Sequence, residues 1–195
     1  MNKTRGFSLV ELLVVLGVMA LVLAVASADF SRIYRRGALR QAGFRLLTDA
    51  QRCQTLAIQH LAKVGLVFDT DHRGSFYVLV VDGNGNGVSR KDYLTGRDQV
   101  VGNPVYFQDF CPQVRLGLPS GWRVPQPGGG GLVSENGVQV GHAGILSFSP
   151  TAGATAGSVF LSSGSEVLAL RVTPLGTARL FTWNAQRGLW EPVRF

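Results

Sequence analysis

The feature that most constrains this chain is a long apolar run close to its N-terminus. Residues 7–28 carry one charged side chain, Glu11, and contain no proline. About 20 apolar residues in a helix suffice to cross the hydrocarbon core of a bilayer, so the run predicts a membrane-spanning helix. A secretory signal peptide would end in a small-residue cleavage site, whereas this apolar run continues into a further helical stretch. We therefore expect an anchor that the mature protein retains.

Residues 30–63 predict an amphipathic continuation of the same helix, because apolar residues recur there at nearly helical spacing. One helix over residues 7–62 would be about 84 Å long. Its second half would pack one face on a sheet. The arginines between the apolar positions fit a solvated face beside lipid headgroups, and they also fit contacts with acidic neighbours. The apolar positions are Ile33, Leu39, Phe44, Leu46, Leu47, Ala50, Leu56, Ala57 and Leu61.

From residue 64 onward the pattern changes to short strands separated by turn residues. Residues 64–69 and 75–81 predict a hairpin. Residues 112–144 are rich in Gly and Pro, and residues 125–131 within them predict a loop. The resulting fold class is α+β, with the long helix packed on an antiparallel sheet or β-sandwich domain. Further strands are expected at residues 145–149, 158–162, 166–173, 178–182 and 189–193.

The formal net charge is +7 and the chain has two cysteines. A basic balance suits nucleic acid, an anionic membrane surface or an acidic protein partner, and it also suits an ordinary basic periplasmic protein. Cys53 and Cys111 form no metal-binding pattern with the histidines. In an exported domain they could form one disulfide, although their spacing does not say whether they meet.

The N-terminal sequence GFSLVELLVVLGVMALV, with Gly6, Phe7 and Glu11, resembles the class III signal of type IV prepilins and pseudopilins. The sequences ILSFSPTAGATAGSVFLSS and EVLALRVTPLGTARLFTW near the C-terminus resemble the minor pilins of the GspH/FimT group. The resemblance implies that a prepilin peptidase cleaves between Gly6 and Phe7 and that the new amine of Phe7 is methylated. Glu11 would then pair with the Phe7 amine of a neighbouring subunit, because a carboxylate inside a membrane span needs a partner.

This resemblance divides the chain into four segments: a leader (1–6), a transmembrane and assembly helix (7–29), an amphipathic extension (30–63) and a globular β-rich domain (64–195). It implies a single-pass protein of the inner membrane with its C-terminal domain in the periplasm. The implied function is a minor pseudopilin of a type II secretion pseudopilus, a non-enzymatic part in protein export. Its partners would be other pseudopilins or pilins, the inner-membrane assembly platform and the prepilin peptidase.

The alternative function is a minor pilin of a type IV pilus, similar to FimT or FimU, that binds DNA for uptake. Arginines near the C-terminus could form a basic stripe, with Trp183 and Trp190 available to stack on bases. Arginines at alternate strand positions also form ordinary solvated faces, which is the simpler interpretation. The arginines of the stripe are Arg171, Arg179, Arg187 and Arg194.

One loop has the composition of a calcium site. Asp82, Asn84, Asn86 and the following Gly87 match the first half of an EF-hand loop, and Asp92 is the nearest acid to the closing position. The closing position itself holds Tyr93, so the match is incomplete. A tight Asn/Gly turn explains the same residues without a metal.

No motif in the sequence indicates an enzyme. His60, His72 and His142 are scattered, and none forms a metal-binding pair. A nucleophile elbow, a phosphate-binding loop and a dinucleotide-binding glycine pattern are all missing from the sequence. We therefore expect a non-enzymatic protein with no required cofactor, calcium being the one candidate.

Overall fold

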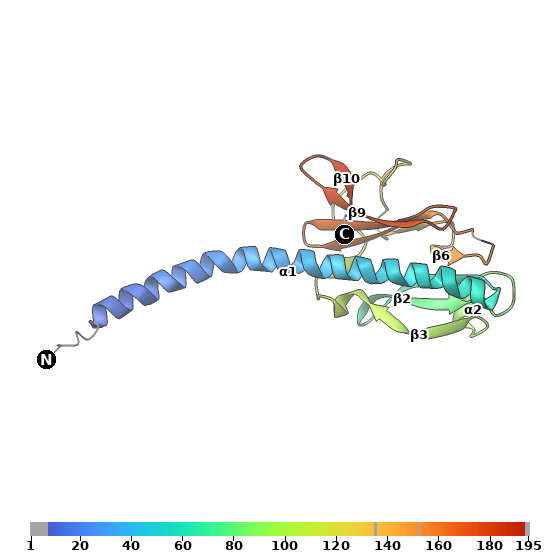
Figure 1. The fold of residues 1–195 in the computed structure, drawn as a ribbon, viewed down its shortest axis with the longest axis horizontal. Coiled ribbons are helices and arrows are strands. Elements are labelled where there is room, and N and C mark those ends of the chain that lie inside the picture. The colour runs from blue at the N-terminus through green and yellow to red at the C-terminus, as the bar shows by residue number, and fades with distance from the viewer. Residues whose placement is uncertain (1–7, 135, 152, 194–195) are drawn as a thin grey trace. The chain divides into compact units, whose positions relative to one another are not determined.

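The computed structural model describes residues 8–193, apart from Glu135, Ala152 and the side chains of residues 25–29 (Figure 1). The chain divides into two compact units, residues 1–34 and residues 35–195. One helix, α1 (Leu9–His60), contributes to both units. The expected continuous N-terminal helix is therefore confirmed over these bounds.

In the first unit, α1 exposes apolar side chains. The Oγ of Ser8 accepts a hydrogen bond from the N–H of Val10 (3.2 Å), and its carbonyl accepts one from the N–H of Leu12 (3.1 Å), so Ser8 caps the first turn. Every side chain of residues 9–24 is exposed, and most are Leu or Val. This part of the helix therefore buries no apolar face within its own unit.

In the second unit, α1 has one buried face. Ala42, Leu46, Ala50, Cys53 and Ala57 are fully buried, and they follow one another at intervals of three or four residues. That spacing places them in one stripe along the helix. The arginines and glutamines between them face solvent for the most part, as the amphipathic pattern predicts.

The strands of the second unit form two antiparallel sheets. One is four-stranded, in the order β3-β2-β1-β6, and the other is six-stranded, in the order β10-β9-β8-β7-β4, with β5 also paired to β7. The elements that follow α1 are β1 (Val64–Asp71), β2 (Gly74–Val81), α2 (Arg90–Leu94), β3 (Gln99–Tyr106), a 3-10 turn (Phe107–Asp109), β4 (Val114–Leu116), β5 (Val138–Val140), β6 (Ile145–Phe148), β7 (Gly157–Ser163), β8 (Glu166–Val172), β9 (Ala178–Asn184) and β10 (Leu189–Pro192).

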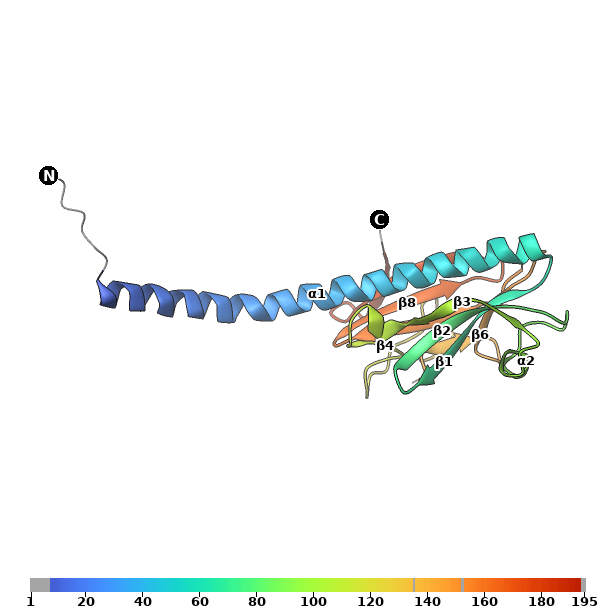
Figure 2. The same cartoon turned by 90° about the horizontal axis from the view of Figure 1, so that it is seen from below.

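The buried stripe of α1 and the inner faces of both sheets share one hydrophobic core. Figures 1 and 2 show the second half of α1 lying along the two sheets. Gly43 lets the helix approach β8 closely, because a Cβ at this position would lie 2.8 Å from Cδ2 of Leu168. Along β8, Leu168 and Leu170 face this core, whereas Ala169 belongs to a small cluster on the outer face of the six-stranded sheet.

The α+β class and the antiparallel β domain are confirmed, but several short elements were not predicted. The hairpin of β1 and β2 and the strands β6 to β10 lie where the sequence placed them. The expected loop at residues 125–131 lies outside every helix and strand, whereas the longer Gly- and Pro-rich segment around it contains the short strands β4 and β5, which both pair with β7. The helix α2 and the strand β3 were also not predicted from the sequence patterns.

Candidate functional site

The processing motif lies partly outside the described residues. Gly6 and Phe7, where cleavage and methylation are expected, are not among them, and neither are the side chains of residues 25–28 in the expected span. Glu11 is described: it lies in the first turn of α1 and its side chain is exposed. Over the residues that the structure describes, none of the helices provides an apolar stretch of sufficient length to span a bilayer.

A buried polar cluster joins α1 to the four-stranded sheet. Asp49 is 4% exposed although it lies beside the apolar stripe of α1. Its Oδ2 accepts hydrogen bonds from the Tyr77 hydroxyl on β2 (2.7 Å) and from Nε of Arg45 (2.9 Å). Burial, followed by the bond to Asp49, raises the pKa of Tyr77, so the hydroxyl stays protonated as a donor. The hydrogen bond between Asp49 and Tyr77 positions α1 against β2.

The loop after β2 is organised by buried carboxylates. Asp82 accepts hydrogen bonds from the backbone N–H groups of Asn84 (3.2 Å), Gly85 (2.8 Å) and Gly87 (2.7 Å). The Oδ1 of Asn84 in turn accepts one from the N–H of Asn86 (3.1 Å). These are the bonds of consecutive Asx turns, which is the metal-free interpretation of this sequence.

Asp92 and Asp98 hold the other side of the same loop. The Oδ2 of Asp92 accepts hydrogen bonds from the side chains of Asn86 (3.0 Å) and Ser89 (2.8 Å), and these bonds lower the pKa of Asp92. Asp98, only 2% exposed, accepts from the N–H groups of Gly83 (3.2 Å) and Ser89 (3.1 Å). The loop is thus a closed network of carboxylates and N–H or O–H donors.

The calcium set stays a prediction. Asp82, Asn84 and Asn86 lie in one loop and Asp92 follows on α2 (Arg90–Leu94). The oxygens of Asp82, Asn84 and Asp92 already accept hydrogen bonds from this segment, and Asn86 donates its Nδ2 to Asp92. Among the described residues, no three His, Cys, Asp or Glu side chains lie close enough together to hold a metal ion. A calcium ion would therefore have to replace N–H donors around these oxygens.

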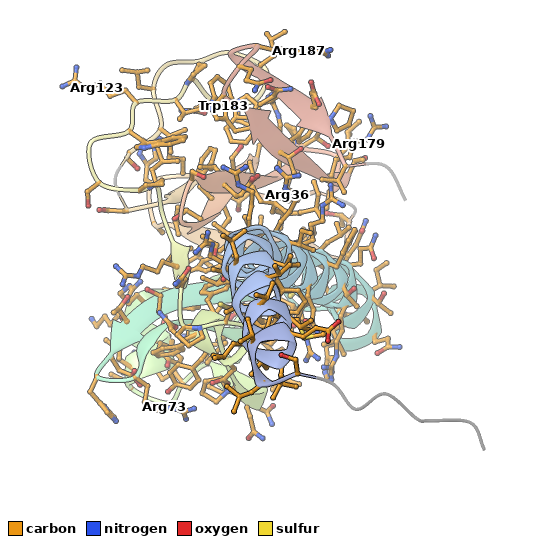
Figure 3. All side chains as sticks on the ribbon, turned by 90° about the vertical axis from the view of Figure 1, so that its left-hand side faces the viewer. Arg36, Arg73, Arg123, Arg179, Trp183 and Arg187 are labelled. Atoms are coloured by element: carbon orange, nitrogen blue, oxygen red, sulfur yellow. The ribbon has the colours of Figure 1, made fainter. Side chains whose placement is uncertain are left out.

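The predicted arginine stripe is only partly assembled. Arg171 on β8 and Arg179 on β9 are direct cross-strand partners, and neither has an acidic partner among the described residues. Arg187 is paired with Glu191 (3.3 Å), and Arg194 lies outside the described residues. Figure 3 shows Arg179 and Arg187 on the side of the six-stranded sheet, away from Arg73.

The two tryptophans expected beside the stripe are in contact with each other. Trp183 on β9 and Trp190 on β10 have ring centroids 5.3 Å apart. The Nε1 of Trp190 donates to the carbonyl of Pro125 (2.6 Å), and its ring also contacts Phe160. Trp190 is therefore used to hold the loop that contains Pro125 on the sheet, and only Trp183 is left to stack on a ligand.

Cys53 and Cys111 are both buried, and both are free thiols. They belong to the same hydrophobic core, Cys53 on the buried stripe of α1 and Cys111 after the 3-10 turn. The disulfide considered from the sequence is therefore not present in the structure. Burial, with a further contribution from the charge of Asp49, raises the pKa of Cys53 and keeps it in the unreactive thiol form.

Sequence reasoning missed the Asp49 and Asp98 interactions. A signal for Asp49 existed, because it is an acid next to Ala50 on the apolar face of an amphipathic helix, where a buried carboxylate needs a partner. Asp98 carried no such signal, since it lies in a polar segment whose path depends on the pairing of β3 with β2.

Comparisons with known proteins identify a motif of a known family and a pilin-like relative. The family model described as the prokaryotic N-terminal methylation motif matches residues 1–27, which include Gly6, Phe7 and Glu11. The pilin-like protein PilA1 of Thermus thermophilus is 42% identical over 82 residues, which are 42% of this chain and 51% of that protein. The chain thus spans about half the length of this curated relative. No solved structure matches the chain.

Proposed function

We propose, on the premise that this chain is a type IV pilin-like protein, that it is a structural, non-enzymatic subunit of a filament anchored in the inner membrane. The observation that carries the proposal is the construction of α1. Its first part exposes apolar side chains and begins with the methylation motif, and its second part supplies the core of a β domain. Such a helix can pack against copies of itself while the β domain remains folded in the periplasm.

The proposed assembly uses Glu11. After cleavage between Gly6 and Phe7, the free amine of Phe7 is a cation at nearly the same depth as Glu11 of a neighbouring subunit. An unpaired carboxylate in a span costs about 2.5–3.5 kcal/mol on insertion scales. Pairing it with the amine would offset that cost and set the axial register between subunits.

Processing and assembly are tested together. The full chain is produced with a prepilin peptidase, and mass spectrometry of the purified protein should show loss of residues 1–6 and one added methyl group. Glu11→Ala should be processed but should no longer co-purify with its filament partners. Glu191→Ala, which removes an exposed carboxylate of the β domain, is the control and should co-purify normally. An intact leader, or normal assembly of Glu11→Ala, would contradict the proposal.

Within this role, we favour a minor pseudopilin of a type II secretion pseudopilus, whose partners are other pseudopilins, the assembly platform and the prepilin peptidase. The support is the resemblance of the C-terminal strands to the GspH/FimT group. Deleting the gene should then abolish export of secreted enzymes and leave surface pili intact. Loss of pili with normal secretion would instead support a minor pilin of a type IV pilus.

The pairing of Arg171 with Arg179 favours DNA binding as a second candidate function. Like charges directly opposite each other on two strands are unfavourable, and a bound phosphate would relieve the repulsion. Gly128 leaves room for the Arg171 guanidinium, because a Cβ there would overlap it. Trp183 on the same face could stack on a base.

Duplex binding as a function of salt tests this candidate. The double variant Arg171→Gln, Arg179→Gln should bind more weakly and reduce the slope of log K against log salt by about two. Arg52→Gln, which removes an exposed arginine of α1, is the control and should have a smaller effect. Equal effects of the two changes would show that the protein binds DNA only through its general positive charge.

A further inference from the structure

A small pocket of about 320 Å³ lies on the outer face of the six-stranded sheet, at its β4 edge. Arg115, Gln113, Ser120 and Ser162 provide its polar lining, and Leu118 and Pro119 provide an apolar wall. The arginine stripe, the calcium loop and the assembly surface of α1 use none of these residues. The functions proposed so far therefore assign no ligand to this pocket.

The pairing of β4 with β7 forms the pocket. Val114 and Leu116 point toward the core side, and Arg115 between them points to the outer face, where its cross-strand partner is Ser162. Serine is much shorter than arginine, and Ser162 is only 5% exposed. The Arg115 side chain therefore borders a hollow whose floor is a hydroxyl group.

The pocket has positive charge and hydrogen-bond donors but no carboxylate among its lining residues. Arg115 has no acidic partner in the described part of the chain. A second cation lies near the rim, since Nε of Arg35 is 3.8 Å from the position that a Cβ on Gly164 would occupy. The acid of this turn, Glu166, is already bound to Arg36 (2.6 Å). The site is therefore suited to an oxyanion.

The described carboxylates of the second unit make another copy of it a poor source of that oxyanion. Within residues 35–193, every described carboxylate either accepts hydrogen bonds or forms an ion pair within its own molecule. Several arginines of the same unit have no acidic partner there. These arginines are Arg35, Arg40, Arg52, Arg115, Arg123, Arg171 and Arg179.

We propose that this pocket binds a carboxylate on an acidic segment of a different protein chain. Arg115 supplies the charge, Ser120, Ser162 and Gln113 donate hydrogen bonds, and Leu118 contacts the methylene groups of the bound side chain. The volume is at the lower end for ligand pockets and fits one side chain or a chain terminus. The proposal goes beyond the filament role, because it assigns a ligand chemistry to a surface that assembly through α1 does not use.

The test measures fluorescence anisotropy of a labelled hexaglutamate peptide with blocked ends, added to the full chain in neutral detergent. The wild type should bind hexaglutamate and not hexaglutamine. Arg115→Gln should weaken binding about tenfold, since hydrogen bonds to charged groups contribute more than neutral ones. The matched control is Arg52→Gln, an exposed arginine of α1 that is also without an acidic partner among the described residues and does not line the pocket, and it should change affinity less than about twofold.

A second variant separates the pocket from the charge. Ser120→Phe keeps Arg115 but fills the cavity from its exposed rim, and it should weaken binding without lowering the thermal midpoint of unfolding. A neutral peptide with a free C-terminal carboxylate distinguishes a chain terminus from an acidic side chain as the bound group. Equal losses for Arg115→Gln and Arg52→Gln, or binding of anionic lipid vesicles with no binding of either carboxylate peptide, would overturn the proposal.

Discussion

Two tyrosine hydroxyls of this protein donate to aspartates over the same distance, 2.7 Å, in different surroundings. Tyr77 and Asp49 are buried between α1 and β2, whereas Tyr106 and Asp71 lie at a partly exposed hairpin end. Tyr77→Phe should lower the free energy of unfolding by about 1–3 kcal/mol, because it removes a donor from a buried carboxylate. Tyr106→Phe removes the same bond where water can replace it and should cost less. Chemical denaturation measures both, and equal costs would contradict the argument.

The Tyr106 hydroxyl also affects the titration of Asp71. Its hydrogen bond is the main reason why the pKa of Asp71 is lowered, with backbone N–H bonds from Arg73 and Gly74 adding to it. A lowered pKa means that this carboxylate stabilises the fold above its unfolded pKa of about 3.9 and loses that contribution as the pH falls through its folded pKa. In Tyr106→Phe the pKa of Asp71 should rise toward its ordinary value. NMR titration of the Asp71 carboxyl carbon measures the shift, with Asp92 as the unaffected control.

At the scale of elements, the loop between β2 and β3 should be stable through its carboxylates alone. Asp82→Ala leaves the N–H groups of Asn84, Gly85 and Gly87 without an acceptor, which should open the loop at a cost of about 1–3 kcal/mol. Hydrogen exchange should accelerate at these amides and not in β7 and β8. Exchange that stays slow in the variant would show that other bonds order the loop.

The same loop tests the calcium prediction. Calorimetry with calcium at millimolar concentration should give heat of binding if the ion can replace the hydrogen-bond donors around the oxygens of Asp82, Asn84 and Asp92 and also bind the Asn86 amide oxygen. Asp92→Asn would then reduce that heat, because calcium sites gain affinity from carboxylate charge. No heat with the wild type would remove the calcium prediction and leave the Asx-turn interpretation.

The strands that sequence patterns predicted are the long ones with uninterrupted apolar or alternating residues, such as β7 and β8. The strands that were missed have specific reasons. β3 contains Gly102 and Pro104, which argue against a strand, and it tolerates them because it is an edge strand with a bulge. β4 and β5 have three residues each and depend on β7 as a partner. The Arg115 pocket could not be predicted either, because it needs the register of β4 on β7.

At the scale of the whole molecule, the second half of α1 is part of the β domain. The fully buried residues Ala42, Leu46, Ala50, Cys53 and Ala57 cover the inner faces of both sheets, which share one core. Without them, Leu168 and Leu170 on β8 and Leu66 on β1 would face water. Burying each such side chain is worth about 1.5–3 kcal/mol, so exposing several together would remove much of the roughly 5–15 kcal/mol that is usual for a domain.

A pair of truncations tests this dependence. A fragment of residues 35–195 contains the buried stripe and should unfold cooperatively, with dispersed NMR signals. A fragment of residues 64–195 contains every strand but lacks the helix, and it should aggregate or bind hydrophobic dyes, since both sheets expose their inner faces. Adding a synthetic peptide of residues 35–62 should restore part of the cooperative transition. Cooperative unfolding of residues 64–195 alone would show that the two sheets form a sufficient core by themselves and that α1 only lies on its surface.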